Sequence, residues 1–552
     1  MDTMELPTHY NDWPTDKGYD PEYEQREPVE LPVTGKIPAY AAGIVYRTGP
    51  GKSQVNADNG EILRLSHWFD GFSQTHRFEI LAPDDTHPSP RVFYNSRFST
   101  DDLIQSAIKT GTLDGVGFGQ KRDPCKSILG KAQSEYVPKP TPSSKNIGVT
   151  LSINFPGLDK GEKDSVESTS RWNNSQGVRT LYAKTDYNAL KKIDPVTLEP
   201  IGLASQADLH PELSGQLSAS HSRSDPITGD MFNFNLTLGP ACTYRVFQVS
   251  AATGETTILA TFSATPAYLH SLLITQDHVI LCVWNAHVNP LGMTGSFLDA
   301  ILPTDPNQPA VWYVIDRKGG QGLIATYESP AFFCFHTINA WLEPSENGSQ
   351  MDIVADVVRS DNCDLIKTLY YENLISSLDT AKEFQKNRDD SLRTSITRFR
   401  LPCVPQTPCG NVKKATVEWS ACNSLSPELP TLNPNKGTSK HRYVYAVTFR
   451  GESTLIDGIM KLDCDTQEVR LWAFHGHSPG EAIFVADPEG SNEDDGVLLS
   501  VVLDGICGKS YLLCLDARDL SELGRASVDG VVGFGFHGQH VPADGGIPTG
   551  DY

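Results

Sequence analysis

The sequence predicts an all-β protein built as a β-propeller, and three observations support this prediction. One hairpin signature recurs six times, strand-like segments separated by turn residues fill most of the 552 residues, and helical periodicity is sparse. A propeller assembles many small sheets around one axis, so a long chain can form a single unit. A pair of β-sandwich domains is the alternative that this pattern alone leaves open.

The repeated signature is an apolar strand, an Asp or Ser, a tight polar turn and a second strand. Asp and Pro favour the start of such a turn, and Gly or Asp tolerates the positive φ at its end. The irregular spacing of the copies indicates blades that carry long loops on one face. The copies lie at residues 193–197, 224–229, 249–254, 315–319, 462–466 and 515–519.

Two segments depart from this pattern. Residues 1–35 are polar and rich in proline and acidic residues, which predicts an extended N-terminal arm. Residues 36–552 are then expected to form a single propeller domain. The segment from about Thr368 to Gln385 has apolar residues at helical spacing, and it predicts a helix in an insertion between blades.

The composition and the N-terminal sequence limit which binding partners and which cellular compartment we expect. With 46 Lys and Arg against 68 Asp and Glu, the formal charge is −22, so we expect no nucleic-acid partner. The 11 cysteines form no CxxC pair, which argues against a disulfide framework and a Cys-rich zinc site. The N-terminus lacks a signal-peptide pattern, and no apolar run approaches the ~18–20 residues of a spanning helix. We expect a cytoplasmic protein, with peripheral membrane contact as an open alternative.

Four of the 15 histidines lie in apolar, strand-like contexts on different hairpins: His221, His270, His336 and His537. A single histidine in such a place is usually a satisfied core residue. Four can converge, because the inner strands of a propeller line one axis. Four neutral imidazoles suit iron(II) and leave two positions open on an octahedral ion, whereas zinc would form a closed tetrahedral site. The ligands alone do not decide between the two metals.

Several short motifs, taken together and in this order, resemble the carotenoid cleavage oxygenases from about Gly43 to the C-terminus. The resemblance implies a seven-bladed propeller with loop and short helical insertions capping one face, and Fe(II) on the axis held by the four histidines. His540 is a close rival for the last position, but Phe536-His537-Gly538 fits the family motif better. The motifs are Val-Tyr-Arg-Thr-Gly-Pro at 45–50, His-Trp-Phe-Asp-Gly at 67–71, His-Arg-Phe at 76–78, Ser-His-Ser-Arg-Ser-Asp-Pro at 220–226, Leu-His-Ser at 269–271, Phe-His-Thr-Ile-Asn-Ala at 335–340, Glu-Asp-Asp-Gly-Val-Leu-Leu-Ser at 493–500 and Phe-His-Gly at 536–538.

The resemblance also implies three carboxylates that accept the other N–H of three imidazoles. The implied pairs are Glu428 with His336, Glu481 with His537 and Asp186 with His270, which leaves His221 without a carboxylate. The family has glutamate where this chain has Asp186. Because aspartate is one methylene shorter, we expect a loose or water-bridged contact between Asp186 and His270.

The implied reaction is cleavage of a C=C double bond of a carotenoid or apocarotenoid by O₂, giving two carbonyl products. The partners would be an apolar conjugated substrate and O₂, in a tunnel of aromatic residues that the sequence does not identify. A stilbene-cleaving dioxygenase is the first alternative, but relatives of that kind carry a lysine where this chain has Thr185, with Lys184 one residue away. A non-catalytic binding scaffold is the second alternative.

Isomerisation of retinyl esters ranks below cleavage. Residues 123–128 resemble a motif of the animal carotenoid and retinoid branch of the family. The aromatic residues that follow this motif in the membrane-bound isomerase are missing here.

Overall fold

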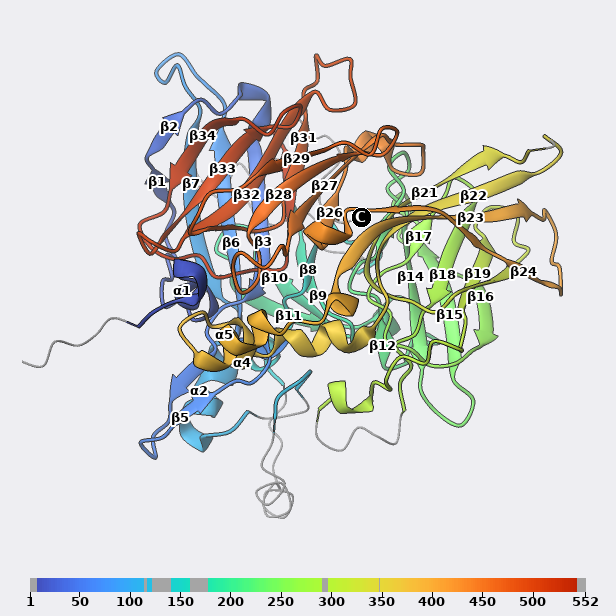
Figure 1. Cartoon of the computed structure of the whole chain (residues 1–552), viewed down its shortest axis with the longest axis horizontal. Coiled ribbons are helices and arrows are strands. Elements are labelled where there is room, and N and C mark those ends of the chain that lie inside the picture. The colour runs from blue at the N-terminus through green and yellow to red at the C-terminus, as the bar shows by residue number, and fades with distance from the viewer. Residues whose placement is uncertain are drawn as a thin grey trace, which may run out of the picture.

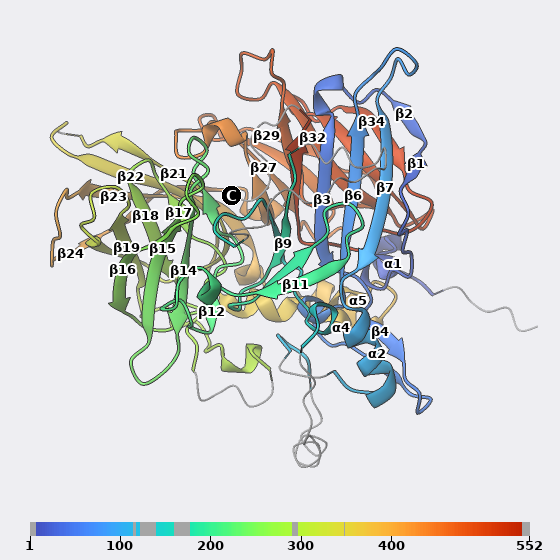
Figure 2. The same cartoon turned by 180° about the vertical axis from the view of Figure 1, so that it is seen from behind.

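The structure is a computed structural model that describes residues 7–113, 117–121, 140–158, 177–289, 296–346 and 348–543. Within these residues, seven sheets of four to six strands surround a common axis (Figures 1 and 2). The protein is therefore a seven-bladed β-propeller. This confirms the predicted fold class, and the alternative of two β-sandwiches is wrong.

We number the blades in chain order. Blade 1 contains β1 (Val29–Leu31), β3 (Gly43–Pro50), β6 (Ser73–Leu81), β7 (Arg91–Phe98) and β35 (His537–Pro542). Blade 2 contains β8 (Thr150–Ile153), β9 (Leu181–Lys184), β10 (Leu190–Ile193) and β11 (Pro200–Ala204). Blade 3 contains β12 (Leu217–Ser218), β13 (Arg223–Ser224), β14 (Met231–Thr237), β15 (Thr243–Val249) and β16 (Thr256–Ser263). Blade 4 contains β17 (Leu273–Ile274), β18 (His278–Val283), β19 (Ala310–Asp316), β20 (Leu323–Ser329) and β24 (Val412–Lys414).

The remaining three blades follow in the same way. Blade 5 contains β21 (Phe333–Pro344), β22 (Met351–Ser360), β23 (Thr394–Val404) and β25 (Thr416–Ala421). Blade 6 contains β26 (Pro427–Thr431), β27 (Tyr443–Thr448), β28 (Gly458–Asp463) and β29 (Val469–Trp472). Blade 7 contains β30 (His477–Pro479), β31 (Ile483–Ala486), β32 (Gly496–Asp504), β33 (Lys509–Asp516), β34 (Glu522–Ser527) and β2 (Val33–Gly35). A separate hairpin is formed by β4 (Gln54–Asn56) and β5 (Ile62–Arg64).

The two ends of the chain close the ring. Strand β35 pairs antiparallel with β3, so the last strand completes the first blade. The N-terminal segment also spans the junction between blades 1 and 7, because β1 pairs with β7 and β2 pairs with β34. The strand at one edge of each sheet lies nearest the axis, and these inner strands carry the candidate site.

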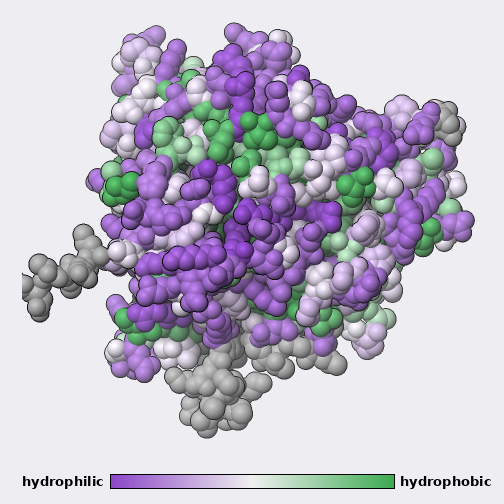
Figure 3. Space-filling model, viewed as in Figure 1, coloured by the Kyte–Doolittle hydropathy of each residue, from purple (hydrophilic) through white to green (hydrophobic). Residues whose placement is uncertain are grey.

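The middle strands are apolar on both faces because each blade packs against its two neighbours. In β32 every residue except the last is buried, and this strand reads as a nearly continuous apolar run. The outer strands face solvent, and most of β25 is exposed. Residues on the face shown in Figure 3 are mostly hydrophilic, although apolar residues gather over blades 6 and 7, where Val469 and Leu471 of β29 are exposed.

The six predicted hairpins are confirmed. Each joins two neighbouring antiparallel strands of one blade: β10–β11, β13–β14, β15–β16, β19–β20, β28–β29 and β33–β34. In the first copy, an Asp194 carboxylate oxygen accepts the N–H groups of Val196 at 2.9 Å and Thr197 at 2.7 Å. This bond pattern explains why Asp stands at the start of the turn.

The residue with positive φ at the end of each turn was expected to be Gly or Asp, and this expectation is met in three of the six copies. Gly229, Gly254 and Gly320 take positive φ, as expected for glycine. The equivalent positions in the other three copies are not Gly or Asp. They are Leu198 (φ 61°), Gln467 (φ 60°) and Leu520 (φ 64°).

Helical segments lie along one side of the propeller, the lower side in Figures 1 and 2. Those labelled there are α2 (Asp101–Thr110), α4 (Tyr371–Leu374) and α5 (Asp379–Lys386). The other helical segments are α1 (Asp16–Tyr19), η1 (Tyr10–Asp12), η2 (Ala39–Ala41), η3 (Trp68–Asp70), η4 (Pro142–Ser144), η5 (Gln206–Asp208), η7 (Leu298–Ala300), η8 (Cys363–Leu369), η9 (Asp390–Leu392), η10 (Asn423–Leu425) and η11 (Pro434–Lys436). Among the described residues no helix is long and apolar enough to cross a membrane, and the ten described cysteines are free.

The predicted helix at about 368–385 is wrong in two respects. The segment is broken into η8, α4 and α5, and it connects β22 to β23 within blade 5 rather than lying between blades. The break between α4 and α5 has a tertiary cause at Ser376. Its carbonyl accepts the Tyr10 N–H at 3.0 Å, and its hydroxyl oxygen accepts the Thr15 N–H at 3.0 Å. The N-terminal segment therefore holds the backbone of this insertion in a non-helical shape.

Candidate metal centre

The four predicted histidines meet on the propeller axis, each from a different blade. His221 lies between β12 and β13, His270 precedes β17, His336 is in β21 and His537 begins β35. Each is at most 8% exposed, and one nitrogen from each lies within 4.8 Å of those of the others. The Nε2 atom of His537 is 3.0 Å from that of His221 and 3.2 Å from that of His336.

These distances fit a shared metal ion. Two imidazole nitrogens about 2.1 Å from one ion, at right angles to each other, lie about 3 Å apart. The close approach of buried nitrogen lone pairs is explained if they are ligands. The chemistry of the set, four imidazoles with no thiolate, fits a borderline transition metal such as iron(II).

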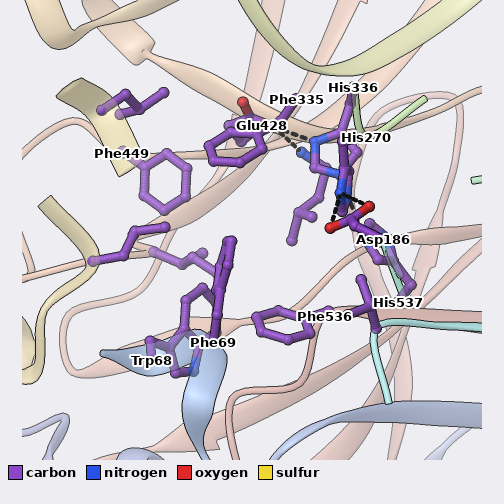
Figure 4. Close-up of a pocket in the computed structure, with 15 residues that line it drawn as sticks. Trp68, Phe69, Asp186, His270, Phe335, His336, Glu428, Phe449, Phe536 and His537 are labelled. Carbon is purple, nitrogen blue, oxygen red and sulfur yellow. Dashed lines mark hydrogen bonds and ion pairs between the residues drawn. The ribbon is translucent and has the colours of Figure 1, made fainter. Parts of the chain in front are cut away.

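Three carboxylates orient three of the rings, and Figure 4 shows two of them, Asp186 and Glu428. Glu428 at the inner edge of blade 6 lies 2.6 Å from His336 Nδ1, and Glu481 of blade 7 lies 2.8 Å from His537 Nδ1. Since a carboxylate accepts, each Nδ1 donates its hydrogen, which leaves the Nε2 lone pair directed at the centre. These are the pairs that the family resemblance implies.

The contact of Asp186 with His270 differs from the expectation. The two Asp186 oxygens lie 2.9 and 3.0 Å from His270 Nδ1, so the expected loose or water-bridged arrangement is wrong. The backbone compensates for the missing methylene. Asp186 follows β9, and its carbonyl accepts the N–H of Ser218 in blade 3 at 2.9 Å. The Ser220 and Tyr268 hydroxyls also donate to its oxygens, at 2.7 and 2.9 Å.

Burial keeps three of the imidazoles, those of His221, His336 and His537, in the neutral form that binds metals. It lowers the pKa of His336 to about 4, although Glu428 acts in the opposite direction. It also lowers the pKa values of His221 and His537 well below the ordinary value, and the neighbouring imidazoles add to the effect. Burial raises the pKa of Glu481 to about 8, against the opposing effects of Arg47 and the Gly538 N–H. A cation bound by His537 would also lower this pKa, which favours the carboxylate form that accepts the Nδ1 hydrogen.

The centre borders an apolar cavity (Figure 4). The histidine and carboxylate groups lie at one side of it, and aromatic and aliphatic side chains form the rest of the described wall. A ligand in this space would contact the metal centre with its hydrocarbon surface enclosed. The apolar lining residues are Trp68, Phe69, Val149, Phe335, Leu365, Leu369, Leu429, Phe449, Ile456 and Phe536.

The short helix η3 holds the cavity wall together. His67 Nε2 donates to the carbonyl of Ile366 in η8 at 3.0 Å, while its Nδ1 accepts the Phe69 N–H at 3.2 Å. The Asp70 carboxylate accepts the N–H groups of Phe118 at 2.6 Å and Gly119 at 2.8 Å. Segments that are distant in sequence are thereby fixed around Trp68 and Phe69.

The sequence predicted aromatic wall residues as a type but not individually, and it did not predict the aliphatic residues that form the other half of the apolar lining. Phe335 and Phe536 each directly precede a histidine of the centre, and Trp68 and Phe69 lie in the motif at 67–71, so these four had a local signal. Leu365, Leu369, Phe449 and Ile456 come from the insertions, and no local pattern marks them.

Other residues singled out in the sequence lie apart from the cavity. His540 Nε2 contacts the Ala41 carbonyl at 3.1 Å, away from the four-histidine cluster. The Lys184 ammonium donates to the Ser222 hydroxyl at 2.8 Å and does not line the described cavity. In the motif at 493–500, Glu493 accepts two backbone N–H groups at the start of β27, which makes this part structural. Residues 123–128 lie outside the described part of the chain.

A second group of metal-compatible side chains comes from the middle strands of blades 5 and 6 and their ends: Asp356, His441 and Cys464. Both Asp356 oxygens accept from the Arg398 guanidinium, at 2.8 Å each. The Cys464 thiol is buried, and burial raises its pKa. This group is therefore an ion-pair network of the core.

Fold and site together define a class: a β-propeller with a buried cluster of four imidazoles on its axis, which could hold a metal ion beside an apolar cavity. The family described as retinal pigment epithelial membrane protein (RPE65) matches residues 19–542. The chain belongs to this family, the carotenoid oxygenases.

The relatives agree with this membership, and the solved structures agree with the fold. The chain is 40% identical to a carotenoid dioxygenase of Neurospora crassa, over 97% of this chain and 92% of the relative. It is also 40% identical to a torulene dioxygenase of Fusarium fujikuroi, over 98% and 95%. A solved structure of a Synechocystis apocarotenoid oxygenase variant has a TM-score of 0.72 at 21% identity, covering 97% of this chain and all of the other. A cobalt-substituted form of the Synechocystis protein has a TM-score of 0.71 at 22% identity, with the same coverage.

Proposed function

We propose that this carotenoid oxygenase is a non-haem iron(II) dioxygenase that cleaves one C=C double bond of a carotenoid or apocarotenoid with O₂, giving two carbonyl products. The observation that carries the proposal is the convergence of four buried imidazoles on one point at the wall of an apolar cavity. The names of the relatives, carotenoid dioxygenase and torulene dioxygenase, support the substrate class.

Each group of residues has a role in this proposal. His221, His270, His336 and His537 hold the metal, while Asp186, Glu428 and Glu481 fix three of the rings by accepting their Nδ1 hydrogens. Iron(II), when bound, supplies the activation of O₂ for addition to the double bond.

The cavity wall positions the substrate relative to the metal centre. Aromatic and aliphatic side chains favour a conjugated hydrocarbon and exclude water, so the double bond that reaches the centre is set by the shape of the wall. No side chain has to act as a nucleophile or general acid. The proposal treats residues 36–552 as one catalytic unit and residues 1–35 as an arm that adds β1 and β2 to blades 1 and 7. Peripheral contact with a membrane stays a prediction.

The position of Lys184 favours carotenoids over stilbenes. Its ammonium is buried and bonded to Ser222, and the residue directly before Asp186 is Thr185, which offers no cation to a phenol. A stilbene substrate would therefore lack the partner that stilbene-cleaving relatives provide.

The proposal is tested by incubating iron-loaded protein with a carotenoid, an apocarotenoid and a stilbene under ¹⁸O₂, followed by mass spectrometry. We expect two carbonyl products from the carotenoid or apocarotenoid, each with ¹⁸O at the new carbonyl, and none from the stilbene. Cleavage of the stilbene alone would overturn the substrate assignment. Iron-loaded protein that cleaves none of the three would favour a binding scaffold.

A further inference from the structure

Three of the four histidine-bearing inner strands are bonded to one another beside the metal centre. The His221 N–H donates to the His270 carbonyl at 3.1 Å, which joins blade 3 to blade 4. The Ser271 hydroxyl donates to the Phe335 carbonyl at 2.9 Å and accepts the Thr337 N–H at 3.1 Å, which joins blade 4 to blade 5. The spacing of these ligands therefore depends on contacts between blades.

Blade 5 needs these contacts because its own ladder is interrupted at the ligand. In the pairing of β21 with β22, Cys334 lies opposite Arg359, but the next pair is Thr337 with Val357. Residues 335 and 336 thus have no partner in the regular register, as in a bulge that redirects a side chain. The hydrogen bonds within blade 5 therefore do not by themselves fix the position of the His336 ring along the propeller axis.

Arg223 lies where all three strands meet. It is two residues after His221, is 5% exposed, and donates from Nε to the Leu272 carbonyl at 2.8 Å. Its terminal nitrogen donates to the Thr337 carbonyl at 2.7 Å and to the Thr337 hydroxyl at 2.5 Å. That hydroxyl in turn donates to the Leu272 carbonyl at 2.9 Å, which closes a triangle of bonds.

The two residues that Arg223 contacts are immediate neighbours of ligands. Leu272 is two residues after His270, and Thr337 is one residue after His336. A guanidinium holds its donors in a rigid plane, so it fixes the separation of two acceptors. A lysine ammonium is a point donor on a flexible stem and cannot do so.

We propose that Arg223 is a positioning residue that sets the spacing of His221, His270 and His336 around the metal. It acts through the backbone of the strands and does not itself contact the ion. The inference rests on the proposed function, in that these histidines hold a metal.

The test uses full-length protein loaded with Co(II), whose visible ligand-field spectrum reports the arrangement of the ligands. Arg223→Lys keeps the positive charge and removes the planar set of guanidinium donors. Thr337→Val is close in shape and removes the hydroxyl from the triangle. Arg398→Lys is the matched control. Arg398 is buried like Arg223, but it lies in blade 5, outside the metal centre, where it donates to both oxygens of Asp356.

We expect Arg223→Lys to shift the Co(II) spectrum and to weaken Co(II) binding by roughly 10–100-fold in chelator competition, the size typical of lost support around a ligand. Thr337→Val should shift the spectrum in the same direction by less. Arg398→Lys should lower the melting temperature and leave the spectrum and affinity unchanged.

Three results would overturn the inference. One is a folded Arg223→Lys protein with the spectrum and affinity of the unaltered chain. Another is an equal change in Arg398→Lys, which would assign the effect to general destabilisation. If Arg223→Lys does not fold, an unchanged spectrum in Thr337→Val counts against it in the same way. Failure of the unaltered protein to bind Co(II) or Fe(II) would instead overturn the proposed function, and this inference with it.

Discussion

At the scale of single residues, Asp186 shows which features of the site can be predicted from the sequence. That a carboxylate stands near His270 follows from the motif, but its distance from the ring does not. The distance depends on bridges between Asp186 and Ser218 and between Tyr187 and Leu217, which draw the end of β9 toward blade 3. No local feature of residues 182–187 specifies that pairing. The four histidines were easier to predict because each has its own apolar, strand-like context.

The direct contact predicts that Asp186 and Glu481 behave alike. Asp186→Asn and Glu481→Gln each remove the negative charge and present an amide to a donating Nδ1–H, so metal affinity should fall by roughly 10–100-fold with the fold retained. Asp186→Glu should not improve binding, because Ser220 and Tyr268 already hold the shorter carboxylate in place. Chelator competition measures all three. Unchanged affinity in both amide variants, or tighter binding in Asp186→Glu, would contradict this account.

At the scale of secondary-structure elements, the hairpins were predictable and the helical insertion was not. The hairpin is encoded locally, because an Asp at the start of the turn bonds the backbone two and three residues later. The break at Ser376 depends on Tyr10 and Thr15, which lie more than 350 residues away in the chain. A periodic apolar pattern therefore indicated a continuous helix that tertiary contacts prevent.

The turns also predict a stabilising substitution. Gln467 holds φ at 60°, in the left-handed region that is unfavourable for a residue with a side chain. Gln467→Gly should raise the free energy of unfolding by about 0.5–1 kcal/mol, after allowing for the greater freedom of glycine in the unfolded chain. The reverse change, Gly320→Gln, is the matched control. Gly320 has φ 68°, and a Cβ atom there would meet open space. The change in the free energy of unfolding of Gly320→Gln should therefore come from the backbone conformation alone.

Chemical denaturation of both variants measures these effects. A loss of stability in Gln467→Gly would show that the glutamine side chain makes a compensating contact. A neutral Gly320→Gln would show that the left-handed conformation carries little cost in these turns.

At the scale of the whole molecule, ring closure could not be predicted from the sequence. The pairing of Thr48 with His537 joins residues at opposite ends of the chain, and no spacing rule identifies such a partner. The same closure places His537 beside the other three histidines. The metal centre is thus a property of the complete ring, while its individual ligands are encoded locally.

The buried histidines predict how stability depends on pH. Burial lowers the pKa of His67 to about 4 and that of His76 to about 3. In the unfolded chain both histidines titrate near pH 6.5. Below that pH the unfolded state therefore binds more protons than the folded state. Stability should therefore fall as the pH drops from about 6.5 to 4, by about 3 kcal/mol for His67. Denaturation at pH 7.5, 6 and 4.5 measures the slope.

His67→Gln removes one of these groups and should flatten the slope, even though it also weakens the contact with η8. A stability that does not change between pH 7.5 and 4.5 would show that these rings are protonated in the folded protein.

The most direct test of the central claim is the metal content of the purified protein after loading with Fe(II). We predict one iron per chain for the unaltered protein and for His540→Ala, since His540 is buried on the same strand as His537 but contacts Ala41. We predict loss of the iron in His336→Ala. Retention of one iron per chain by His336→Ala, or a folded, unaltered protein that takes up none, would contradict the assignment of a four-histidine iron centre.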